Sequence, residues 1–75
     1  MLKFVGTDEN GNEVFERQIT SIEGVRIIAP AEGELTGPHV VELYDCQGVY
    51  HTETVNTPEE AEELVDQAVD ALGED

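Results

Sequence analysis

The last nineteen residues carry the strongest folding signal in the chain, because they contain every part of an amphipathic helix. Thr57 can cap the free backbone amides, Pro58 suits the first helical position, and Glu60 can complete a capping box with Thr57. Apolar residues then recur at spacings of three and four along one stripe: Ala61, Leu64, Val65, Ala68, Val69 and Leu72. With Gly73 as a left-handed stop, the pattern predicts a helix over Pro58–Leu72.

The opposite face of this helix is predicted to be acidic and without cations. From Thr57 to the end of the chain there are eight acidic residues and no Lys or Arg. Carboxylates four residues apart repel each other by about 0.2–0.5 kcal/mol per pair at low salt. Such a face needs strong screening or a cationic partner. The candidate partner-binding residues on it are Glu59, Glu63, Asp66 and Asp70.

The length and the net charge of the chain limit its domain organisation and the partners that it can bind. Seventy-five residues predict a single small acidic domain, residues 1–75, with a modest core. Three basic and eighteen acidic residues give a net charge of −15, which argues against nucleic acid or an anionic membrane as a partner. No apolar run could span a bilayer, and the N-terminus lacks a signal-peptide pattern, so we expect a cytoplasmic protein.

The acids are spread over turns, strands and helix, while Lys is nearly absent and Val and Thr are frequent. This balance resembles that of cytosolic proteins from salt-in halophiles, especially haloarchaea. The resemblance is one of composition along the whole chain, carried by no motif, and it implies a surface adapted to concentrated salt.

The first half of the chain predicts a hairpin and a third strand. Residues 2–7 and 14–19 alternate apolar and polar side chains around Asn10-Gly11, the strongest short signal for a type I′ turn. That two-residue turn would place Leu2 opposite Ile19 and Phe4 opposite Arg17. Residues 24–29 read as a third strand, and residues 30–38 as an exposed loop bounded by prolines.

A second hairpin is predicted from residues 39–44 and 49–55, with two registers open. A two-residue turn puts Leu43 opposite Tyr50 and Glu42 opposite His51, whereas a bulged turn with Gly48 left-handed puts Tyr44 opposite Tyr50. We favour the first register, because Leu43 and Tyr50 then share the core face.

Together these elements predict a two-layer α+β domain. About five antiparallel strands, from two β-hairpins and a middle strand, carry one C-terminal amphipathic helix on one face. The other face also presents apolar residues, namely Val5, Val14, Ile28, Val40 and Val49. Either the sheet curls into a partial barrel or this uncovered face meets a second copy in a homodimer.

Two motifs suggest metals only weakly. Asp8-x-Asn10-x-Asn12 is typical of the opening of a calcium loop. An EF-hand loop that begins at Asp8 would need glycine at its sixth position and glutamate at its twelfth, but these are Glu13 and Ile19, so we expect a polar turn. The soft ligands His39, Cys46 and His51 should lie apart on one hairpin, with His51 paired to Glu42. We therefore expect neither metal nor cofactor.

The sequence indicates a non-catalytic protein. The carboxylates offer no enclosed pocket that would separate the pKa values of an acid and a base, and nothing provides an oxyanion hole. We expect a small acidic binding or accessory module with a protein partner or itself as partner. The alternatives are an acidic DNA-mimic or anti-defence inhibitor that occupies the basic nucleic-acid-binding groove of another protein, and a small enzyme or metal carrier built on the two histidines and the cysteine.

Overall fold

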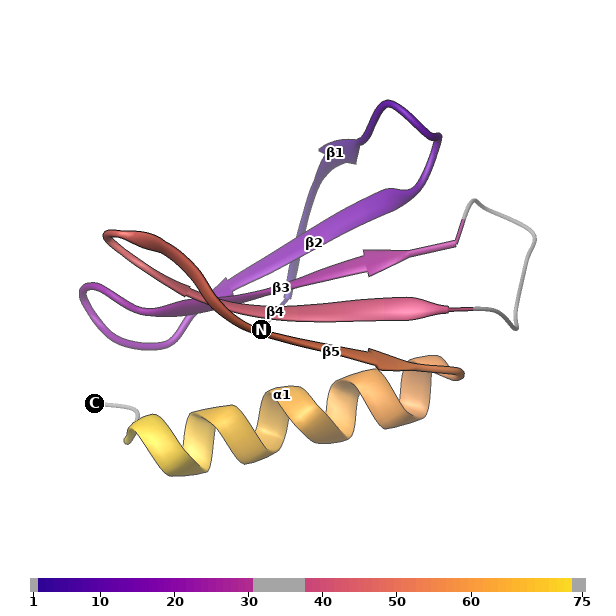
Figure 1. The fold of residues 1–75 in the computed structure, drawn as a ribbon. Helices are drawn as coiled ribbons and strands as arrows, with labels where there is room; N and C mark the ends of the chain where they lie inside the picture. The colour runs from indigo at the N-terminus through magenta and orange to yellow at the C-terminus, as the bar shows by residue number, and fades with distance from the viewer. Residues whose placement is uncertain (1, 31–37, 74–75) are drawn as a thin grey trace.

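The computed structural model describes residues 2–30 and 38–73. Five strands form one antiparallel sheet in the order β1-β2-β3-β4-β5, and a single helix lies across one face of it (Figure 1). This confirms the two-layer α+β arrangement. The elements are β1 (Lys3–Thr7), β2 (Glu13–Gln18), β3 (Gly24–Ala29), β4 (His39–Asp45), β5 (Gly48–Val55) and α1 (Pro58–Leu72). Most of the predicted loop, residues 31–37, lies outside the described residues.

The helix begins and ends where its sequence signals predict. The Thr57 hydroxyl accepts a hydrogen bond from the Glu60 amide at 3.2 Å and donates one to the Glu60 carboxylate at 3.1 Å. Gly73 adopts a φ of 73° and donates its amide hydrogen to the Val69 carbonyl at 3.0 Å. These caps satisfy backbone groups that the helix itself leaves unpaired.

The core lies between α1 and the middle of the sheet. Val25 in β3 is fully buried, and it is joined by Ile27 and Val41 from the same sheet face. The helix contributes its predicted stripe, of which Ala61, Val65 and Ala68 are buried and Leu64, Val69 and Leu72 pack against the edge of the core. In Figure 1 the helix runs beneath β4 and β5, whereas the β1–β2 hairpin rises away from it.

The first hairpin has a different register from the one predicted. Phe4 lies opposite Phe15, with ring centroids 5.5 Å apart, and the strands are joined by residues 8–12 rather than by a two-residue turn. The cause is Asp8, whose backbone amide donates to the Asn12 carbonyl at 2.9 Å and holds a longer loop. Among the described residues only glycines have positive φ, so Asn10 cannot form a type I′ turn.

The second hairpin combines the two registers that the sequence left open. Near the turn, Tyr44 lies opposite Val49, as in the two-residue turn that we favoured. A bulge then shifts the pairing, so Leu43 lies opposite His51 and no longer opposite Tyr50. The expected core position of Tyr50 is therefore wrong: its side chain is 49% exposed and donates a hydrogen bond to Glu23 at 3.2 Å.

The face of the sheet away from α1 is partly apolar, with a charged centre. Val14, Ile28 and Val40 lie side by side across three strands and are half-buried. Beside them Arg26 binds Glu16 at 2.9 Å and Glu42 at 3.1 Å. These bonds, that to Glu16 foremost, raise the pKa of Arg26, so the guanidinium stays charged.

Tyr44 packs against the charged centre, where it contacts Arg26 and Gly24. The Arg26 guanidinium lies 4.9 Å from the centroid of its ring, a cation–π distance. The ring lies over Gly24, where a Cβ atom would come within 2.5 Å of the Tyr44 hydroxyl and 2.9 Å of the Arg17 carbonyl. Glycine at position 24 is what lets Tyr44 pack on the strand.

Candidate interaction surfaces

The four predicted partner-binding residues form a single line on the outer side of α1. Glu59, Glu63, Asp66 and Asp70 are all exposed, and their spacing of four, three and four places them opposite the buried stripe. We call this line the acidic crest. No ion pair to any of them is found in residues 2–30 and 38–73, and the last helical turn holds no basic residue. The crest therefore presents four charges to solvent.

The two flanks of the helix differ in charge. The flank toward β1 and β2 carries Glu62 and Asp66, which line a groove with Leu2 and Arg17. The flank toward β5 is formed by Leu64, Gln67 and Ala71, and we call it the neutral flank. Gln67 and Ala71 are exposed and uncharged, and the acid on the same side of the helix, Glu60, lies two turns before Gln67. The acids of α1 are thus unevenly distributed around its exposed surface.

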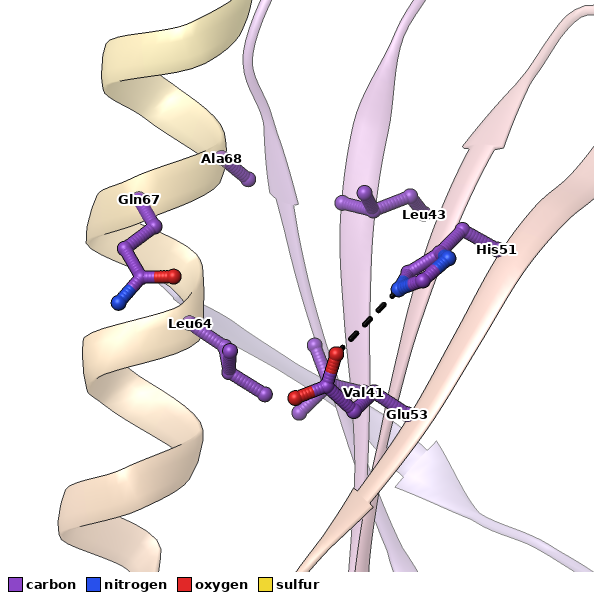
Figure 2. Close-up of a pocket in the computed structure, with 7 residues that line it drawn as sticks. All are labelled: Val41, Leu43, His51, Glu53, Leu64, Gln67 and Ala68. Carbon is purple, nitrogen blue, oxygen red and sulfur yellow. Dashed lines mark hydrogen bonds and ion pairs between the residues drawn. The ribbon is translucent and has the colours of Figure 1, made fainter.

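A groove lies between the neutral flank and the last hairpin. Its volume is about 180 Å³, and Val41, Leu43, Leu64 and Ala68 give it an apolar floor. Figure 2 shows Gln67 on one wall and the side chains of His51 and Glu53 on the other. His51 Nε2 and Glu53 Oε1 are 3.4 Å apart, and both side chains are about half exposed. Such a surface can hold apolar side chains under a polar rim.

The soft metal ligands do not converge. His39 is buried near the start of α1, Cys46 is exposed in the β4–β5 turn, and His51 lies on the groove wall. In the described part of the chain no three His, Cys, Asp or Glu side chains are grouped so that they could hold a metal ion. The expected pairing of His51 with Glu42 is wrong, because the bulge places His51 opposite Leu43 and Thr52 opposite Glu42.

The Asp8-x-Asn10-x-Asn12 motif builds a turn. The Asp8 carboxylate accepts hydrogen bonds from the backbone amides of Asn10 and Asn12, both at 2.9 Å, and from the Asn12 side chain at 3.3 Å. These bonds, that from the Asn12 amide foremost, lower the pKa of Asp8. The Asp8 oxygen atoms therefore accept hydrogen bonds that stabilise the loop of the first hairpin, as expected for a polar turn.

Sequence reasoning missed the Glu16–Arg26–Glu42 cluster and the groove beside the neutral flank. Neither is visible without the strand register, since the cluster joins residues ten and sixteen positions apart. The neutral flank could have been found from the sequence. Gln67 and Ala71 are the two exposed helix positions that are not acidic, although every other exposed position of α1 is.

Comparisons with protein-family models, with curated proteins and with solved structures found no match to this chain. Among the described residues no helix combines the length and apolar character needed to cross a membrane. The assignment of function therefore depends on the surfaces described above.

Proposed function

We propose that this chain is a small non-catalytic binding or accessory module of the cytoplasm, with a surface adapted to concentrated salt. The observation that carries the proposal is the acidic crest, in which Glu63 has acidic neighbours three and four residues away and no cation beside it. At low salt these contacts are repulsive. A cytoplasm rich in salt would screen them, because the Debye length falls to about 3 Å at 1 M.

Binding suits the surfaces better than catalysis does. The ionisable side chains of the groove, His51 and Glu53, are both about half exposed, whereas an acid–base pair is commonly set in environments that push its two pKa values apart. The partners that fit are another protein or a second copy of the chain. A nucleic acid or an anionic membrane would be repelled by the net charge of −15.

The test is the salt dependence of folding. Helical circular dichroism and the melting temperature would be followed from about 0.05 M to about 3 M KCl, across which the screening length falls several-fold. A marginal fold at low salt that gains stability steeply supports adaptation to salt. A firm fold at low salt with no further gain contradicts it.

A second function is favoured by the geometry of the crest, namely that of an inhibitor that mimics nucleic acid. Helix residues rise 1.5 Å each, so the four crest charges fall about 4–6 Å apart along one line. The crest is therefore a regular line of negative charge, less dense than a DNA strand with its one charge per about 3.4 Å. Such a line could enter the basic groove of a DNA-binding protein.

This second function is tested by displacement of a labelled DNA duplex from basic DNA-binding proteins at about 0.15 M salt. Replacement of Glu59, Glu63 and Asp66 by Lys should abolish displacement with the fold intact. A control variant reverses three acids away from the crest: Glu9, Glu13 and Glu53. Equal loss in both variants, or no displacement by the unmodified chain, would exclude a specific role for the crest.

A further inference from the structure

We propose that two copies of this chain join through the outer edge of β5, so that their sheets form one continuous antiparallel sheet. Each copy contributes five strands, and the two α1 helices lie on the same face. The proposal concerns assembly and holds whether the acidic crest serves salt adaptation or a basic partner.

The β5 edge is open for pairing. It is the last strand of the sheet, it has eight residues, and the first seven are exposed. A long edge strand presents unpaired backbone groups that readily accept another strand. The opposite edge is less suitable, because β1 has only five residues and its bulge, between Phe4 and Gly6, lies in the middle of the strand, whereas the bulge of β5 lies near its start, before His51.

The side chains of β5 are self-complementary in one register. A two-fold axis through Thr52 places His51 of each copy opposite Glu53 of the other, and Thr52 opposite itself. A histidine that donates a hydrogen bond to a carboxylate and a pair of threonines both stabilise antiparallel strands, whereas two carboxylates directly opposite each other destabilise them. A shift of two residues in pairing would put either Glu53 opposite Glu53 or His51 opposite His51. The sequence of β5 thus favours the register centred on Thr52.

The same arrangement turns the two neutral flanks toward each other. His51 and Glu53 lie on the sheet face that carries α1, at the rim of the groove (Figure 2). With both helices on this face, Leu64, Gln67 and Ala71 of one copy would face those of the other across the joined grooves. Glu60, at the start of this flank, is already bonded to Thr57. The acidic crests point outward, away from the contact.

The uncovered sheet face is a poorer contact for a second copy. The partly buried cluster of Glu16, Arg26 and Glu42 occupies its centre, and its two carboxylates would meet those of the other copy. Burial of such a cluster carries a desolvation cost that apolar contacts must exceed. The β5 edge instead brings together uncharged side chains and places a histidine, which can donate a hydrogen bond, opposite a carboxylate.

Disulfide trapping tests the register. In a Cys46→Ser background, Thr52→Cys would place two thiols directly opposite, with Cα atoms about 4.5–5.5 Å apart, within reach of a disulfide. The matched control is Thr54→Cys on the same strand and face, whose two copies would lie about 14 Å apart. We expect mild oxidation at about 2 M KCl to link Thr52→Cys rapidly and Thr54→Cys hardly at all. Equal linking of both variants, or of neither, overturns the proposed register.

Sedimentation equilibrium tests the contact between the helices. At about 2 M KCl, Gln67→Glu with Ala71→Glu should raise the dimer dissociation constant about tenfold, because carboxylates enclosed in the contact lose their solvation, a cost that salt does not relieve. The control with the same added charge, Asn10→Asp with Ser21→Asp, should leave it unchanged. Circular dichroism would show that both variants are folded.

Two results would overturn the proposal. One is a monomer at about 100 µM protein and 2 M KCl, where an obligate dimer would persist. The other is a dimer that resists the Gln67 and Ala71 changes but dissociates with Ile28→Glu, which is the behaviour of a contact through the uncovered sheet face.

Discussion

Reversal of one charge on the acidic crest should stabilise the protein, and the gain should vanish in salt. Glu63 lies in the second turn of α1 with Glu59 four residues before it, Glu60 three before and Asp66 three after. Glu63→Lys converts three repulsive contacts into attractive ones, and glutamate and lysine have nearly equal helix propensities. The helix dipole contributes little, because its effect is confined to the terminal turns.

The magnitude follows from these three contacts. If each changes from a repulsion of about 0.2–0.5 kcal/mol to an attraction of the same size, the helix gains about 1–3 kcal/mol at low salt. For a domain of this length that corresponds to an increase in melting temperature of about 5–25 °C. At about 3 M KCl screening should reduce the gain to a few tenths of a kcal/mol.

The assay is thermal unfolding followed by circular dichroism at about 0.05 M and 3 M KCl. The matched control is Glu9→Lys, which makes the same change of charge in the β1–β2 turn, outside the helix. If Glu63→Lys gains no more than Glu9→Lys at low salt, net charge and not the local contacts decides stability. A gain that stays undiminished at high salt would refute the electrostatic reasoning altogether.

Three further predictions concern the sheet. Gly24→Ala should lower the free energy of unfolding, measured in urea, by about 1–3 kcal/mol, because its Cβ atom would overlap Tyr44. Adding Tyr44→Leu should recover part of this loss, whereas an unchanged stability of Gly24→Ala would contradict the close packing. Arg26→Met should lower the free energy of unfolding by about 1–3 kcal/mol, because it leaves partly buried carboxylates without their cation. Adding Glu42→Gln should make this loss smaller, and equal losses in the two variants would show that the ion pairs do not affect stability. Because the pKa of Asp8 is lowered in the fold, its ionised carboxylate stabilises the fold above the pKa of an unfolded aspartate, and this contribution is lost as pH falls through the folded-state pKa. Between about pH 5 and pH 2, the melting temperature of Asp8→Asn should therefore fall less steeply than that of the unmodified chain. Parallel melting curves would show that the turn bonds do not depend on the charge.

The elements that the sequence predicted correctly are those with local signals at their ends. The helix has Thr57 and Pro58 at its start and Gly73 at its end, and β3 is followed directly by Pro30. Such residues act through their own backbone, so their effect is visible in one stretch of sequence. The two-layer arrangement follows from the helix stripe and the alternation of the strands.

The registers could not be predicted, because single residues displace them. The Asp8 carboxylate stabilises a loop of five residues where Asn10-Gly11 favours two, and one bulged residue in β5 moves His51 to the core-facing position. A shift of one residue exchanges the two faces of a strand. The partners of Arg26 and the rim of the groove depend on these shifts, which is why the cluster and the groove emerged only from the structure.

The distribution of charge on α1 separates what salt adaptation explains from what it does not. A general adaptation to salt would place acids at exposed helix positions without regard to direction. The crest and the flank toward β2 follow that expectation, but Gln67 and Ala71 are exposed and neutral, and they border the one groove whose wall also carries a self-complementary strand. An uncharged stretch at Gln67 and Ala71 fits the proposed pairing of two copies, because net charge elsewhere on the surface keeps the chain separate from other neighbours.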